Sequence, residues 1–177
     1  MRTGFAIFSR RRLLRGSLTA GGFLLMGGAG LWALRGRAPQ VDKLRCLTDH
    51  EYRTLAALTR ALFPHGGAFA MGAEDAGLER AFDTFLADEP EWNRADLKRA
   101  LFLLEYGPVI FDRRLRTFSN LSEEERLAHF QSWSESRTLV RRQAALAFRK
   151  FLTLVFYDQP GAWPALGYGG PIVGAKQ

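Results

Sequence analysis

The sequence predicts an all-α fold: a single small bundle of about five helices, with an irregular C-terminal tail of Gly, Pro and aromatic residues and an N-terminal signal or anchor helix before it. Three observations support this. Apolar residues recur at helical spacing in five segments. Two segments open on a capping box, Thr48–Glu51 and Ser122–Glu125. No segment shows the polar–apolar alternation of a strand strongly enough to compete with these helices.

The N-terminal segment has the composition of an export signal. The motif Ser9-Arg10-Arg11-Arg12-Leu13-Leu14-Arg15 directly precedes an uncharged stretch over residues 16–34. A basic region followed by a modestly apolar one is typical of the twin-arginine signal, with Arg10 and Arg11 as the pair that the translocase reads. A generic secretory signal or a plain membrane anchor is the alternative. The twin-arginine route exports proteins that have already folded in the cytoplasm. We therefore expect a periplasmic location or the periplasmic face of the inner membrane.

The sequence leaves open whether this segment is removed. As a helix, residues 16–34 would be about 28 Å long, close to the ~30 Å of a hydrocarbon core. Gly36-Arg37-Ala38 offers the small residues that cleavage needs, but Pro39 after the cut is unfavourable. Residues 1–38 are therefore predicted to be a cleaved signal or a retained membrane anchor, and residues 39–177 the helical domain.

The net charge of +7 belongs to the N-terminal segment. Residues 1–38 hold seven arginines and no acidic residue, which leaves 18 basic against 18 acidic residues in the rest of the chain. The domain thus lacks the basic footprint of a nucleic-acid-binding protein, and no nucleic-acid partner is expected. It is one domain of ordinary size, large enough to bury a core.

Each of the five predicted helices carries an apolar face at helical spacing. They cover residues 48–63, 74–86, 93–118, 122–133 and 136–156. Pro64 ends the first, and Gly107-Pro108 should kink or break the third. Residues 35–45 are interpreted as a short linker before the first helix. The continuous apolar run over residues 151–156 predicts the centre of the bundle.

The search for catalytic or metal-binding residues is mostly negative. His50, His65 and His129 lie in different elements, and none has a second ligand at metal-binding spacing. Cys46, the single cysteine, cannot form an intrachain disulfide and is interpreted as a small, partly buried residue. There is no haem-attachment motif, phosphate-binding loop or dinucleotide fingerprint. We therefore expect a protein that is not an enzyme and holds no cofactor of its own.

Glu105 lies on the apolar face of the third predicted helix, in line with Leu97 and Leu101. A carboxylate in that position must be paired or hydrogen-bonded, because burying it alone is very costly. The arginines of the fifth helix, Arg137, Arg141 and Arg142, are the expected partners. We interpret the pair as structural, although a functional acid is the alternative.

The C-terminal tail sets aromatic residues between Gly and Pro, in an arrangement expected to be ordered but not helical. One hypothesis is that it folds back over the core of its own domain. The other is that it docks on a partner, since Tyr and Trp are enriched at interfaces. The candidate partner-binding residues are Tyr157, Trp163, Gly167, Tyr168, Gly170 and Pro171.

These features together resemble a known family, the gluconate 2-dehydrogenase subunit 3 family. The similarity spans residues 47–171, and the C-terminal ending is its most specific part. It is carried by Leu62-Phe63-Pro64, Leu121-Ser122 with the glutamates that follow, Trp133, Phe156-Tyr157, Pro160, Trp163 and Gly167-Tyr168-Gly169-Gly170-Pro171.

The resemblance implies an accessory subunit without catalytic residues, a chaperone-like escort. Its large partner would be an FAD-dependent dehydrogenase of the glucose–methanol–choline type, which travels folded on the twin-arginine signal of the small subunit. A c-type cytochrome subunit carrying haem c would pass the electrons to the membrane. The alternative is a stand-alone exported or membrane-anchored helical binding protein of the cell envelope.

Overall fold

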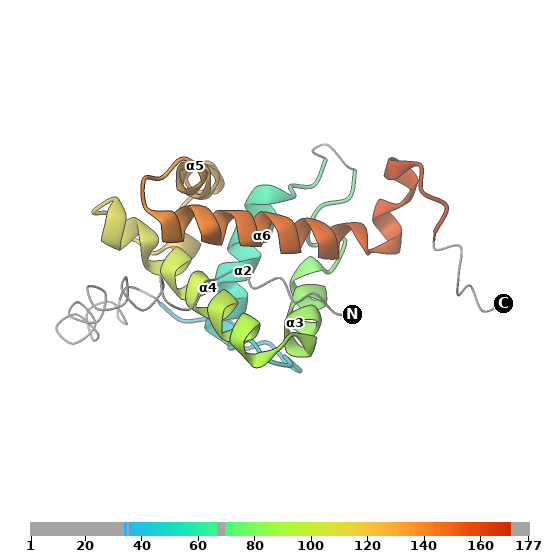
Figure 1. Ribbon diagram of the computed structural model, residues 1–177, viewed down its shortest axis with the longest axis horizontal. Coiled ribbons are helices and arrows are strands. Elements are labelled where there is room, and N and C mark those ends of the chain that lie inside the picture. The colour runs from blue at the N-terminus through green and yellow to red at the C-terminus, as the bar shows by residue number, and fades with distance from the viewer. Residues whose placement is uncertain (1–33, 35, 67–69, 171–177) are drawn as a thin grey trace.

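The computed structural model describes residues 34, 36–66 and 70–170. All-α character is confirmed, since the described residues contain no strand. Figure 1 shows α6 running along the molecule with α2 crossing behind it, and α5 near the beginning of α6. The longer helices are α2 (Asp49–Leu62), α3 (Leu78–Asp88), α4 (Glu91–Phe111), α5 (Glu123–Ser134) and α6 (Leu139–Tyr157). Three short 3₁₀ helices are η1 (Phe118–Asn120), η2 (Pro160–Ala162) and η3 (Pro164–Leu166).

Both predicted capping boxes are present. At the start of α2 the backbone N–H of Glu51 donates to the Thr48 hydroxyl, and the backbone N–H of Thr48 donates to the Glu51 carboxylate 2.8 Å away. Ser122 and Glu125 make the same reciprocal bonds at the start of α5. These bonds satisfy N–H groups that a helix cannot pair internally, which explains why local sequence located both starts.

The third predicted helix differs from the structure in its middle and at its end. α4 continues through Pro108 and ends at Phe111. Of the two predicted outcomes at Gly107-Pro108, a kink or a break, the break is therefore wrong. Both residues are buried, and Gly107 lies directly against α5. Packing at this point offsets the one backbone hydrogen bond that a proline removes. The predicted helical residues after Phe111 instead form a loop and then η1.

Two other helix starts lie later than predicted. α3 begins at Leu78 rather than at residue 74, after Gly77 with a left-handed φ of 59°. α6 begins at Leu139 rather than at residue 136. The residues before α3 form turns and those before α6 are irregular or bent. Periodicity alone does not separate either from a first helical turn.

The core lies where the apolar faces of the helices meet. α2 packs against α3, α4 and α5, and α6 packs against the same three helices from the other side. The rings of Phe63 and Phe156 stack with centroids 4.7 Å apart. The prediction for residues 151–156 is largely confirmed, because Phe151, Leu152, Val155 and Phe156 are buried, but the side chain of Leu154 is exposed to solvent.

The predicted linker is bound to the domain along its length. We call residues 36–47 the N-terminal strap. The Asp83 carboxylate on α3 accepts the backbone N–H groups of Arg45, Cys46 and Leu47 at 2.6, 3.1 and 2.8 Å. Lys98 donates to the Cys46 carbonyl. The strap is therefore part of the folded structure, and tertiary contacts rather than its composition determine its path.

Candidate functional site

The candidate site is the C-terminal tail together with the end of α6. Tyr157 is the last residue of α6, and its carbonyl accepts the indole N–H of Trp163 at 3.0 Å. The Trp163 and Tyr168 rings meet edge-on with centroids 5.5 Å apart. The backbone N–H of Tyr168 also donates to the Trp163 carbonyl. The structure thus brings three of the predicted aromatic residues into one cluster.

Two of the predicted glycines shape this cluster. Gly167 has a left-handed φ of 66° and ends η3. Gly170 has a φ of 100°, and a Cβ on it would lie 3.1 Å from the Trp163 ring. A side chain at either position would strain the backbone or displace Trp163. Pro171 lies outside the described residues.

The tail is neither fully packed on the core nor free of it. It contains the 3₁₀ helices η2 and η3, so the expectation of a non-helical tail is wrong. Ala162 is buried in the core cluster. Tyr157 and Tyr168 keep 40% and 49% of their surface exposed. The tail is therefore anchored through η2 and presents aromatic side chains to solvent, and in Figure 1 it lies at the far end of α6 from α5.

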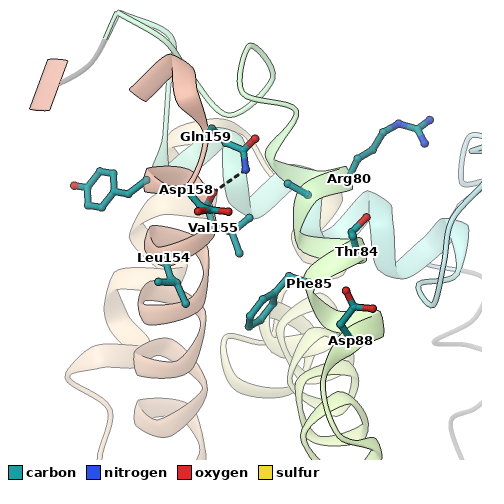
Figure 2. Close-up of a pocket in the computed structure, with 10 residues that line it drawn as sticks. Arg80, Thr84, Phe85, Asp88, Leu154, Val155, Asp158 and Gln159 are labelled. Atoms are coloured by element: carbon teal, nitrogen blue, oxygen red, sulfur yellow. Dashed lines mark hydrogen bonds between the residues drawn. The ribbon is translucent and has the colours of Figure 1, made fainter. Parts of the chain in front are cut away.

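An open groove of about 800 Å³ lies beside the tail, between α3 and the last turns of α6. Figure 2 shows Phe85 of α3 pointing toward α6, with Leu154 and Val155 on the opposite wall. Polar residues line the rim. Gln159 donates to the Val155 carbonyl at 3.0 Å, which is the dashed line in Figure 2. The groove thus has an apolar floor that could receive a side chain or helix of a partner.

The charged side chains on the α3 side of the groove are engaged with the strap. Arg80 donates to the Asp42 carbonyl at 3.0 Å, and Asp88 pairs with Arg45 at 3.0 Å. These contacts engage Arg80 and Asp88, whereas Asp158 lines the groove from the α6 side.

A stripe of exposed apolar side chains leads along α6 to the tail. Leu146 and Leu154 are 66% and 56% exposed, and Leu139 and Tyr157 lie on the same face of the helix. α6 carries four basic residues and no acidic one. Exposed apolar residues that continue into an aromatic cluster are typical of a protein–protein contact. We call this stripe, the groove and the tail the C-terminal surface.

Glu105 is buried as predicted, but its partners are not arginines. Its carboxylate accepts the Thr54 hydroxyl at 3.0 Å, the Ser119 hydroxyl at 2.7 Å and the Ser119 backbone N–H at 3.1 Å. Arg141 instead lies over the rings of Phe111 and Trp133. The predicted pairing with the fifth helix is therefore wrong, and Glu105 instead joins α4 to α2 and η1 through neutral donors.

Sequence reasoning missed a pair formed by the buried His129 and the partly exposed Asp112. Nδ1 of His129 lies 2.6 Å from the carboxylate of Asp112, and Nε2 accepts the indole N–H of Trp133 at 3.0 Å. Burial is the main cause that lowers the pKa of His129, although Asp112 opposes it. Because Trp133 occupies Nε2, the imidazole has no free basic nitrogen for a substrate. Spacing of four residues between His129 and Trp133 was the signal available in the sequence.

The remaining candidate residues have structural surroundings. His65 is exposed and lies 2.6 Å from Asp75. Cys46 is partly buried, as predicted, and burial followed by the hydrogen bond and charge of Asp83 raises the pKa of its thiol to about 11. In the described part of the chain, no group of three or more His, Cys, Asp and Glu residues could hold a metal ion.

Arg10, Arg11 and the uncharged stretch lie almost wholly outside the described residues. None of the helices within those described residues is both long enough and apolar enough to cross a membrane. Comparison with protein-family models, with curated proteins and with solved structures found no significant match.

Proposed function

We propose that the chain is a non-catalytic accessory subunit that binds a folded FAD-dependent dehydrogenase of the glucose–methanol–choline type and escorts it through the twin-arginine translocase. In this proposal residues 1–38 form the signal or retained anchor helix, and residues 39–177 form a single helical domain ending in the docking tail. The complex would work in the periplasm or at the periplasmic face of the inner membrane, with a c-type cytochrome as a further partner.

The C-terminal surface is the observation that carries the proposal. It offers exposed aromatic rings in a frame of Gly and Pro, which lowers the entropy lost on docking. An apolar groove of about 800 Å³ and the apolar stripe of α6 extend it. The polar groups that could suggest catalysis are engaged in internal contacts, as at Glu105 and His129. Supporting evidence from the sequence is the twin-arginine motif and the family resemblance.

Replacing Arg10 and Arg11 by lysine in cells that also make the flavoprotein tests the escort role. We expect both proteins to stay in the cytoplasm, because the translocase reads the arginine pair and the partner has no address of its own. Fractionation followed by flavin absorbance and immunoblotting would measure this. A partner without its own signal that still reaches the periplasm would contradict the proposal.

The groove favours the alternative of a stand-alone envelope binding protein, because it could hold a small apolar ligand. Affinity purification of the tagged full chain from membrane and periplasmic fractions separates the two functions. A stoichiometric flavoprotein in the eluate is expected for the accessory subunit. A chain that elutes alone from every fraction would favour the binding protein.

A further inference from the structure

The loop between α4 and η1 presents an exposed leucine among arginines. We call residues 112–117 the arginine–leucine loop. Leu115 is 81% exposed, more than any other large apolar side chain among the described residues. The sequence around it is Arg113-Arg114-Leu115-Arg116. A leucine held out in water is costly, so a surface that covers it would stabilise the arrangement.

The loop has a defined shape. The backbone N–H groups of Asp112 and Arg114 both donate to the Pro108 carbonyl, at 3.1 and 3.0 Å. Arg113 has a left-handed φ of 55°, which a non-glycine residue seldom adopts. Thr117 is buried and accepts a hydrogen bond from Asn120. Leu115 is therefore presented by an ordered turn between two anchored ends.

The charge around Leu115 is positive. Asp112 is engaged by His129, and Glu125 pairs with Arg114 at 2.7 Å. Arg113 and Arg116 are exposed and form no ion pair with any described residue. An arginine guanidinium matches the geometry of a phosphate group and binds it through two parallel hydrogen bonds. An apolar tip flanked by arginines is thus complementary to an anionic phospholipid surface rather than to a neutral one.

The N-terminal stretch enters the folded domain beside this loop. Asn120, in η1 directly after the loop, donates through its side-chain amide to the carbonyl of Leu34 at 3.3 Å. Arg53 donates to the Arg37 carbonyl at 3.1 Å. Leu34 is the last residue of the uncharged stretch over residues 16–34. If residues 16–34 lie in a membrane, the arginine–leucine loop lies close to the membrane surface.

We propose that this end of the bundle rests on a bilayer containing anionic phospholipid, with Leu115 in the interface and Arg113 and Arg116 on the phosphate groups. The inference rests on the proposed export, since the domain must reach a membrane with its N-terminal segment attached. The C-terminal tail lies at the other end of α6 from this loop (Figure 1). The partner and the membrane therefore contact opposite ends of the bundle.

Fluorescence from a single labelled position tests the contact. The full chain, with Cys46→Ser to remove the natural thiol, carries an environment-sensitive label at Leu115→Cys. Leu146→Cys on the exposed stripe of α6 is the matched control position. Each protein is reconstituted into phosphatidylcholine vesicles with or without phosphatidylglycerol. Nitroxide lipids and aqueous iodide then report whether the label faces lipid or water.

We expect the label at position 115 to be quenched by nitroxide lipids and shielded from iodide in phosphatidylglycerol vesicles, while the label at position 146 stays open to iodide. Arg113→Gln and Arg116→Gln should each lower the ratio of shielded to accessible label about fivefold, the effect of one basic residue at an anionic surface. Added salt should weaken the shielding in the same direction.

Equal iodide access at positions 115 and 146, or shielding that needs no phosphatidylglycerol, would overturn the proposal. So would shielding that appears only when the flavoprotein is added, because the loop would then be a protein interface. The vesicle measurement uses the chain alone, so failure of the escort role does not change it. Conversely, Arg113→Gln with Arg116→Gln should leave co-export intact.

Discussion

Trp133 donates its indole N–H to Nε2 of His129, 3.0 Å away, one turn earlier on α5. This bond requires the neutral imidazole, because a protonated Nε2 would be a second donor facing the same hydrogen. Gly107 of α4 makes the close packing possible, since a Cβ there would lie 2.7 Å from Nε2. The pair thus couples the protonation state of a buried histidine to the packing of α4 against α5.

Acid should destabilise the protein through His129. Burial, the main cause, lowers the pKa of His129 in the folded state below the ~6.5 of an unfolded chain. The contribution to stability is therefore complete above about pH 6.5 and is lost as the pH falls from there through the folded pKa, by up to ~1.4 kcal/mol per pH unit. Urea unfolding between neutral and mildly acidic pH measures the slope.

His129→Gln should reduce this slope, because glutamine can bond to both neighbours without titrating. His65→Gln, at an exposed position, is the control and should keep it. The same slope in the His129→Gln variant as in the unchanged protein would show that another group is responsible.

Glu105→Leu should destabilise the fold by about 1–3 kcal/mol, because the Ser119 backbone N–H loses its acceptor in a buried site. Ser119→Ala in the same chain should recover part of the loss, since it removes the second donor to Glu105. The destabilisation by Arg141→Leu should simply add to that by Glu105→Leu, with no coupling free energy between the two sites. Double-mutant cycles measure both couplings. Strong coupling between Glu105 and Arg141, with none between Glu105 and Ser119, would support the arginine pairing instead.

Asp83→Asn should weaken the attachment of the N-terminal strap, because Arg45 loses its acceptor, and should make Cys46 more reactive. Burial and then the hydrogen bond and charge of Asp83 hold the pKa of the thiol at about 11, so removing the charge lowers it. Reaction with a disulfide reagent, followed over pH, measures the change. Asp88→Asn, on the same helix but away from the thiol, is the control. An unchanged rate for Asp83→Asn would show that burial alone governs Cys46.

Tyr168→Ala should weaken binding of the flavoprotein partner by roughly 2 kcal/mol or more, the loss expected when an aromatic anchor is truncated. Because Tyr168 is half exposed, the melting temperature of the isolated chain should stay unchanged. Trp163→Ala removes the ring on which Tyr168 and Gly170 pack and should weaken binding similarly. Leu115→Ser, at the opposite end, is the control. Normal binding by both tail variants would exclude the tail as interface.

Local sequence determined the helices and the character of the surface. Thr48 with Glu51 and Ser122 with Glu125 each mark a helix start. The two residues of each pair are three positions apart, so their hydrogen bonds need no distant contact. The neutral domain and the burial of Glu105 also follow from the sequence, because charge count and periodicity are local properties. The aromatic residues of the tail were identifiable by their Gly and Pro neighbours.

Tertiary structure alone decided which side chains contact one another across the helices. Glu105 accepts hydrogen bonds from Thr54 and Ser119 instead of pairing with an arginine. α4 continues through Pro108, where the preceding Gly107 packs against the side chains of α5. Asp83 holds the predicted linker against α3 by accepting hydrogen bonds from backbone N–H groups more than 30 positions earlier in the chain. A carboxylate accepts any well-placed donor, and a helix tolerates one missing bond when packing offsets it. Sequence periodicity identifies a buried face, and the partner across it depends on how the helices are arranged.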